Sequence, residues 1–175
     1  MTAMNHHRCH IAFLADHPDA VPVVAAWLHQ KWFRNLDLSP SETEEKVRSW
    51  LSREEIPLAL LALVDSVPVG VVSIIEDDDP LSPEPAYCLN GLYVVAPWRR
   101  RGIGGMLCRR ALVEARRLGL PALSLYTRDA EFYYQGLGWK KVVDTVIESG
   151  PGIELVAFMR PSDATSLADC VQNER

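Results

Sequence analysis

The chain has 175 residues, of which 48% are hydrophobic and 23% charged, a composition typical of one globular domain. This balance excludes a disordered chain, a collagen and a coiled coil as descriptions of the whole sequence. The net charge is −5, from 18 basic and 23 acidic residues, which argues against a nucleic-acid partner. The charge is uneven, however, because residues 99–117 contain seven arginines and one acid, Glu114, a local +6 against −11 elsewhere. This block indicates a local site for an anionic ligand.

The remaining composition narrows the class of protein further. Cys9, Cys88, Cys108 and Cys170 lie far apart and form no C-x-x-C pair, so we expect reduced thiols and no metal site. Residues 1–10 lack the apolar segment of a signal peptide, and no run of about 18 apolar residues predicts a membrane span. We therefore expect a cytoplasmic protein that has no membrane partner.

The first half of the chain predicts one strand, two helices and then a hairpin. A short apolar run at residues 10–15 predicts the strand, and apolar residues at helical spacing predict a helix over 18–33. Ser39, followed by proline and then by Glu42 at the third helical position, predicts the start of a helix that runs to about residue 51. The hairpin strands are expected at residues 57–64 and 69–75.

A polar, proline-rich segment at residues 77–85 predicts a loop, and six further elements are expected after it. These are strands at 86–95, 122–127, around 141–146 and around 153–159, with helices at 102–118 and 130–137. The order predicts an α+β (mixed α/β) fold, with a mostly antiparallel sheet of six or seven strands, about four helices and one β-α-β crossover. We expect a single domain over residues 1–160 and a flexible tail over 161–175.

The segment LYVVAPWRRRGIGG, residues 92–105, carries the chemistry. A buried strand runs into an arginine- and glycine-rich turn and then a helix, whose first N–H groups and positive dipole suit a phosphate. Two phosphate-binding motifs fail on spacing: no lysine follows the glycines as a Walker A loop requires, and Leu107 stands where a dinucleotide fingerprint needs its third glycine. The spacing that fits is R-x-x-G-x-G, at Arg99, Gly102 and Gly104.

This segment resembles the acyl-coenzyme A motif of the GCN5-related N-acetyltransferase (GNAT) family. Residues 132–139, FYYQGLGW, are similar to the family's signature of an aromatic pair followed by glycine and a further aromatic residue. The resemblance covers about residues 57–160. It implies the family's fold, acetyl-coenzyme A as co-substrate, and an amine of a small molecule, peptide or protein as acceptor.

The resemblance also implies site residues. Tyr134 matches the family's proton donor, and the strand that ends at residues 93–95 would splay from its neighbour to bind the pantetheine arm and the thioester. Asp129 stands near a family position beside the coenzyme. The cofactor-binding residues expected from the resemblance are Tyr93, Val94, Val95, Arg99, Arg100, Arg101, Gly102, Ile103, Gly104, Gly105 and Asp129.

The reaction itself sets further requirements. An amine attacks a thioester only as the free base, the leaving thiolate needs a proton, and the oxyanion needs a donor, for which we consider the Val94 N–H. No carboxylate lies on the strand over residues 86–92. The base is therefore open. Asn90 or Tyr87 could hold a water, or an acid from Glu76–Asp79 could reach in, with Asp77, Asp78 or Asp79 in contact with the amine. The alternative is that residues 77–79 form a solvated loop.

Several residues also have a plain structural interpretation. Tyr134 could be a half-buried aromatic, and Tyr133 is expected to point elsewhere on its helix. Arg109, Arg110, Arg116 and Arg117 are expected on the solvated face of the helix over 102–118. Three functions remain open: an N-acetyltransferase acting on a primary amine, a non-catalytic acyl-coenzyme A sensor of the same fold, and a nucleic-acid binder that uses the arginines. Either a monomer or a homodimer is compatible with the sequence.

Overall fold

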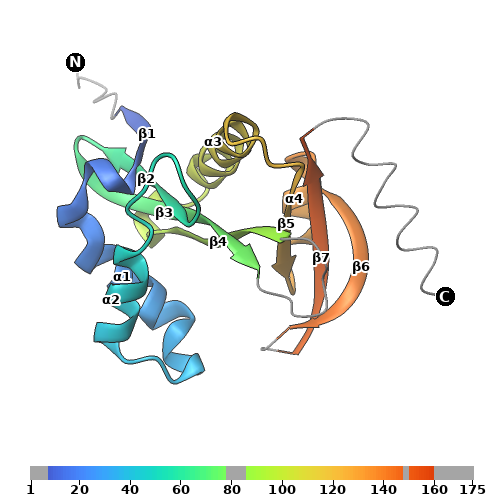
Figure 1. Cartoon of the computed structure of the whole chain (residues 1–175), viewed down its shortest axis with the longest axis horizontal. Helices are drawn as coiled ribbons and strands as arrows, with labels where there is room; N and C mark the ends of the chain where they lie inside the picture. Colours follow the sequence, from blue (N-terminus) through green and yellow to red (C-terminus); the bar gives the residue numbers. More distant parts are fainter. Residues whose placement is uncertain (1–7, 78–85, 148–149, 160–175) are drawn as a thin grey trace, which may run out of the picture.

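The computed structural model describes residues 8–77, 86–147 and 150–159. Over these residues, one twisted sheet of seven strands has the order β1-β2-β3-β4-β5-β7-β6 (Figure 1). The strands are β1 (Cys9–Phe13), β2 (Leu58–Val64), β3 (Val67–Asp77), β4 (Ala86–Val94), β5 (Ala122–Thr127), β6 (Lys140–Ile147) and β7 (Gly150–Phe158). The α-helices are α1 (Val21–Lys31), α2 (Pro40–Arg48), α3 (Ile103–Arg117) and α4 (Glu131–Gly136). The predicted tail, residues 161–175, lies outside the described residues.

All pairs of neighbouring strands are antiparallel except β4 and β5, which are parallel and are joined through α3. This is the single β-α-β crossover that the order of elements predicts, so the expected α+β class is confirmed. The N-terminal helices, α1 and α2, pack together on one face of β2, β3 and β4, while α4 contacts β6 and β7 (Figure 1).

Element boundaries differ from the expected ones where local chemistry intervenes. The helix expected over residues 18–33 divides into a 3-10 turn (Pro18–Ala20), α1, and a second 3-10 turn (Phe33–Leu36). Helix α2 begins as predicted, because Ser39 Oγ accepts from the Glu42 N–H at 3.2 Å while Glu42 Oε2 accepts from the Ser39 N–H at 2.8 Å.

The β2–β3 hairpin is tighter than expected. Asp65 and Ser66 have φ angles of 49° and 66°, the left-handed pair that a two-residue type I′ turn requires. The strands therefore continue to within one residue of the turn on each side. Strand β3 also runs through Asp77, into the segment expected to be a loop, and its last residue pairs with Ala86 of β4.

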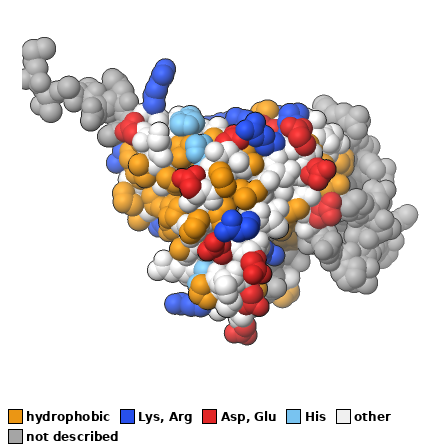
Figure 2. All heavy atoms as spheres, turned by 60° about the vertical axis from the view of Figure 1, so that its left-hand side comes forward, with side chains coloured by type: hydrophobic (Ala, Val, Ile, Leu, Met, Phe, Trp, Pro, Cys, Tyr) orange, Lys and Arg blue, Asp and Glu red, His pale blue; other side chains and the backbone are white. Residues whose placement is uncertain are grey.

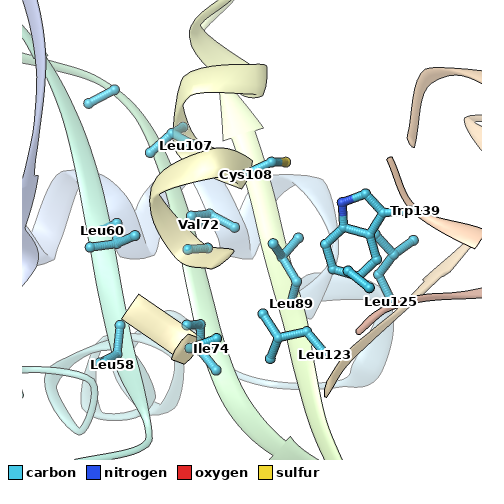
Figure 3. Packing of buried hydrophobic residues seen from close by; sticks show 14 of the residues in the cluster. Leu58, Leu60, Val72, Ile74, Leu89, Leu107, Cys108, Leu123, Leu125 and Trp139 are labelled. Atoms are coloured by element: carbon cyan, nitrogen blue, oxygen red, sulfur yellow. The ribbon is translucent and has the colours of Figure 1, made fainter. Parts of the chain in front are cut away.

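The sheet is buried on both faces. Strand β2 is buried throughout, and its alternate residues serve two cores. The α3-side core contains Leu58, Leu60, Val72, Ile74, Leu89, Leu107, Cys108, Leu123, Leu125 and Trp139 among its members (Figure 3). The α1–α2-side core contains Leu14, Val21, Val24, Leu28, Val47, Trp50, Ala59, Leu61, Leu63 and Val71 among its members. The side of the molecule that Figure 2 brings forward carries lysines and arginines scattered among acids, without a continuous basic band.

Two irregularities in β4 shape the region that matters for function. Its register to β3 slips between the pairs Ser73↔Asn90 and Val71↔Tyr93, so β4 has one extra residue there, and Gly91 has a φ of 63°. On its other side, β4 shares a single register pair with β5, Cys88↔Ser124. Strand β4 continues for six residues beyond that pair while β5 pairs along its whole length with β7, so the two parallel strands diverge.

Candidate active site

A pocket of about 300 Å³ lies where β4 ends and α3 begins. The chain connects the two elements through a 3-10 turn (Ala96–Trp98) and the arginine- and glycine-rich turn. The residues that line the pocket are Leu92, Val94, Trp98, Arg99, Arg100, Gly102, Ile103, Gly104 and Tyr133. Six of these nine were expected at the site from the sequence, whereas Leu92, Trp98 and Tyr133 were not.

The first turn of α3 offers backbone donors that the helix itself does not use. The first intrahelical bond at this end runs from the Met106 N–H to the Gly102 carbonyl at 3.0 Å, so the three preceding N–H groups have no partner within the helix. Gly102 is the N-cap, with a φ of 79°, and neither a capping side chain nor an acid lies in the first turn. A Cβ at Gly102 would meet no atom within 4 Å, so its backbone angle rather than crowding requires glycine. This end of α3 is therefore suited to an external anion.

The three arginines of the turn have different surroundings. Arg99 donates from Nε to the Val94 carbonyl at 2.8 Å, and its guanidinium lies 5.5 Å from the ring centre of Tyr93. The Arg101 guanidinium stacks on Trp98 at 4.7 Å, outside the pocket lining. Arg100, in the left-handed region with a φ of 58°, is exposed and lines the pocket. Arg100 thus presents an exposed guanidinium at the pocket, while Arg99, which also lines the pocket, is hydrogen-bonded to the end of β4.

The end of β4 presents alternate groups to opposite sides. The Val95 N–H donates to the Val69 carbonyl of β3 at 3.0 Å. Because successive N–H groups of a strand point to opposite edges, the Val94 N–H is directed away from β3, to the side on which β5 diverges. Tyr93 instead packs with the α1–α2-side core, where its ring lies 5.7 Å from Trp27 and 6.3 Å from Trp32.

The two neighbouring tyrosines of α4 have different environments. Tyr134 packs against the α3-side core, with its ring 6.2 Å from that of Trp139, and burial raises its pKa well above the usual range of a phenol. Tyr133, expected to point elsewhere, forms part of the pocket wall and is 46% exposed. Burial also raises the pKa of Tyr133. Both phenols are therefore protonated at neutral pH and can act as donors. An adjacent aromatic pair was the only signal in the sequence for a role of Tyr133.

The other expected residues lie at varying distance from the pocket. Gly105 is buried beneath Leu137 and Arg109, and Asp129 is exposed in the turn before α4. The Asn90 carbonyl accepts from Ser73 Oγ at 3.0 Å, just before the β4 bulge. Asp77 is the last residue of β3, whereas Asp78 and Asp79 lie outside the described residues.

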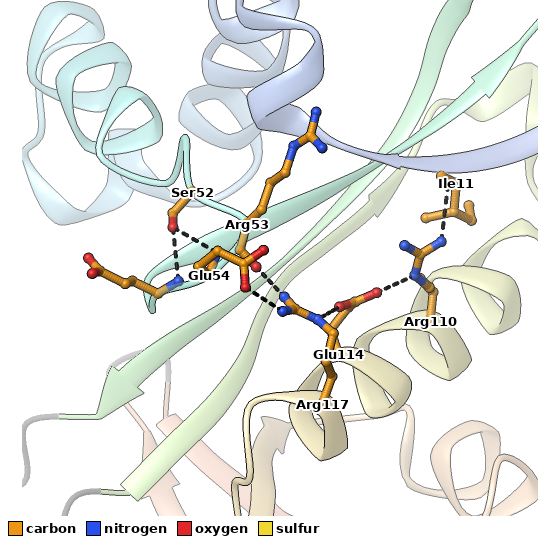
Figure 4. Close-up of polar contacts among 8 residues, drawn as sticks. Ile11, Ser52, Arg53, Glu54, Arg110, Glu114 and Arg117 are labelled. Atoms are coloured by element: carbon orange, nitrogen blue, oxygen red, sulfur yellow. Dashed lines mark hydrogen bonds and ion pairs between the residues drawn. The ribbon is translucent and has the colours of Figure 1, made fainter.

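The later arginines of α3 are not a simple solvated face. Glu114 is only 3% exposed and accepts from Arg110 Nε and Arg117 Nε, each at 2.6 Å (Figure 4). Arg117 also bonds Glu54 at 2.7 Å and the carbonyl of Arg53. Both arginines therefore bind the buried carboxylate, which needs charged donors. Arg117 also joins α3 to the segment before β2, and Arg110 Nη1 donates to the Ile11 carbonyl of β1 at 3.5 Å (Figure 4).

Two further classes of site were sought. Over residues 8–77, 86–147 and 150–159, no group of three or more histidine, cysteine or acidic residues could hold a metal ion. In that same part of the chain, no helix has the length and apolar character needed to cross a membrane.

Solved structures share this fold. An aminoglycoside 6'-acetyltransferase type Ii is 21% identical, with a TM-score of 0.68 over 87% of this chain and 98% of its own. An aminoglycoside 6'-N-acetyltransferase complexed with coenzyme A is 18% identical, with a TM-score of 0.69 over the same shares. The NatC complex bound to Gag peptide and coenzyme A includes a chain 15% identical, with a TM-score of 0.64 over 87% of this chain and 99% of that one.

No curated protein matches the sequence significantly. The model of the acetyltransferase (GNAT) family, however, matches residues 22–139, about two thirds of the chain, which include the β4–α3 turn and the aromatic segment of α4. Together with the sheet order, the diverging parallel strands and the open first turn of α3, this match shows that the chain belongs to the GNAT family of acetyltransferases.

Proposed function

We propose that the protein is an N-acetyltransferase that moves an acetyl group from acetyl-coenzyme A to a primary amine. The observation that carries the proposal is the open first turn of α3, which lies in one pocket with Arg100 and the end of β4. A diphosphate fits such a turn because it takes several backbone N–H groups and a cationic side chain together.

The coenzyme would bind along the divergence of β4 and β5. Its diphosphate would accept from the N–H groups of Ile103, Gly104 and Gly105, with Arg100 beside it. The pantetheine arm would extend along β4 toward Val94, whose N–H is directed into the divergence. This arrangement is supported by the single register pair between the two strands, which leaves the inner edge of β4 unpaired by β5 beyond Cys88.

The chemistry would be a direct transfer without a covalent enzyme intermediate. The neutral amine attacks the thioester carbonyl, the Val94 N–H donates to the oxyanion that develops, and Tyr134 protonates the departing thiolate. The raised pKa of Tyr134 supports this role, because the phenol stays protonated across the pH range in which an amine begins to lose its proton.

The acceptor is proposed to be a cationic amine. The solved relatives are named for aminoglycosides and for a complex bound to Gag peptide, which are both sources of amines. Outside residues 99–117 this chain has an excess of acids, which favours the approach of a cation. For removal of the amine proton we propose a water held by Asn90 or Tyr87 on β4, or a direct contact with Asp77.

The proposal can be tested in two steps. We expect acetyl-coenzyme A in large excess to raise the midpoint of thermal unfolding by several degrees. We also expect thiol release when the protein is incubated with acetyl-coenzyme A and a panel of aminoglycosides, polyamines and peptides. No stabilisation by the coenzyme would contradict the proposal, and stabilisation without thiol release from any amine would instead indicate a binding module.

A further inference from the structure

The hydroxyl of Tyr133 lies against the first turn of α3. A Cβ built on Gly104 would stand 2.6 Å from that oxygen, closer than real Cβ contacts. The absence of a side chain at Gly104 thus leaves room for the Tyr133 hydroxyl beside the unused N–H groups of the helix. Tyr133 comes from α4 and lines the same pocket as Arg100, so two different elements supply polar side chains beside this turn.

A second side chain reaches the same turn. Arg109 folds back from the next turns of α3, and its Nη1 would lie 3.2 Å from a Cβ on Gly105. The charge of Arg109 also acts on the Tyr133 phenol, opposing the effect of burial on the Tyr133 pKa. Burial and the Cys108 thiol outweigh the effect of Arg109 and raise the Tyr133 pKa, so the phenol keeps its proton next to the backbone donors of α3.

We propose that the Tyr133 hydroxyl donates a hydrogen bond to the diphosphate bound at the first turn of α3, so that Tyr133 is a binding residue for the coenzyme. This inference rests on the proposed function, since it requires a diphosphate at that turn. It gives the two tyrosines separate tasks: Tyr133 holds the phosphate end of the coenzyme, and Tyr134 serves the thiol end. Phenylalanine at position 133 would keep the ring and its packing but lose the donor.

The test compares three ligands by their affinity for the wild type and for Tyr133→Phe. Coenzyme A and 3′-dephospho-coenzyme A both contain the diphosphate and are titrated by calorimetry, whereas pantetheine lacks it and is measured by thermal shift at millimolar concentration. Loss of a hydrogen bond to a charged group predicts about ten- to a hundredfold weaker binding of both diphosphate ligands. The response to pantetheine should not change.

The matched control is Tyr126→Phe, which also removes one phenolic hydroxyl. Tyr126 is 43% exposed on β5, on the face opposite to Leu125 and the α3-side core, and its substitution should leave all three affinities unchanged. Unchanged affinity of Tyr133→Phe for coenzyme A, or an equal loss for pantetheine, would overturn the role of Tyr133 while the proposed function stands. If the wild type bound no coenzyme A, the proposed function itself would fail.

Discussion

Burial gives Tyr134 the protonation state that its proposed role as a proton donor requires. Packing against Trp139 and the α3-side core raises its pKa above the ordinary value of 10. The neutral phenol is the form that donates a proton, so the raised pKa extends its useful range to alkaline pH. Almost none of the phenol is ionised at neutral pH, so the raised pKa supports the proposed acid role rather than a role as general base.

Tyr134→Phe should lower kcat about a hundredfold or more, because it removes a positioned proton donor, and should leave coenzyme affinity within about twofold. In the wild type, kcat should rise with pH as the substrate amine deprotonates. No decrease in kcat is expected at any pH up to about 10, because Tyr134 is still protonated there. Steady-state kinetics from pH 6 to 10 and calorimetric titration with coenzyme A check both statements. A variant with unchanged kcat would assign the proton transfer to another group.

Gly104→Ala tests the contact between α3 and Tyr133 without any ligand. In the wild type the new methyl group meets the Tyr133 oxygen at 2.6 Å, so the phenol must swing away and the protein should gain no stability. In a Tyr133→Phe background the nearest ring carbon lies 3.7 Å away, an ordinary contact. In that background Gly104→Ala should raise the unfolding free energy by about 0.4–1 kcal/mol, because alanine reduces the conformational entropy of the unfolded chain. Equal effects in the two backgrounds, measured by thermal unfolding, would contradict the contact.

At the scale of elements, the sequence predicted those that local chemistry determines. The order of strands and helices, the capping box at Ser39 and the glycine turn before α3 were all identified from spacing, because each depends on residues near one another in the chain. The extra residue in β4 at Gly91 and the position of Tyr133 were missed. Both depend on how distant elements meet, β3 with β4 and α4 with α3, and such contacts leave no periodic signal in the sequence.

The ion pairs of α3 are a second case in which contacts between distant segments could not be predicted from the sequence. Helical periodicity predicted a solvated face for Arg110 and Arg117. It could not show that both bond the buried Glu114, or that Arg117 also pairs with Glu54 before β2. Burial alone would raise the pKa of the Glu114 carboxyl. Hydrogen bonds from Arg117 and Arg110, together with their charges, outweigh burial and lower that pKa below about 4.5.

Glu114→Gln should therefore destabilise the fold at neutral pH, lowering the midpoint of thermal unfolding by about 5 °C. A carboxyl whose pKa is lowered in the folded state stabilises the protein above the unfolded pKa and loses that effect as pH falls through the folded one. The difference in unfolding midpoint between the wild type and Glu114→Gln should thus be constant from pH 7 to about 5 and should shrink below pH 4.5. Val113→Ala, at a 53% exposed position of the same helix, is the control. A difference that did not depend on pH would show that the charge of Glu114 has no part in it.

At the scale of the whole molecule, the sheet joins two cores that would otherwise be separate. The α1–α2-side core and the α3-side core share no helix, and β2 connects them through alternate side chains. The proposed coenzyme site lies at the end of β4 toward which both cores converge, with Leu92 and Val94 packed against one and Tyr93 against the other. A rigid sheet between two cores would keep the β4 edge in place as the coenzyme binds beside it.

Leu60 and Leu61 test whether the two cores unfold as one. They are adjacent on β2, both fully buried, and point into opposite cores. Each substitution to alanine should lower the unfolding free energy by about 2–5 kcal/mol. Because the two side chains share one strand, either loss should destabilise the whole sheet, and urea unfolding should stay a single transition by both circular dichroism and tryptophan fluorescence. If Leu61→Ala instead separated the two signals, with the α1–α2 side unfolding first, the cores would be independent units, and the β4 edge would be held by the α3 side alone.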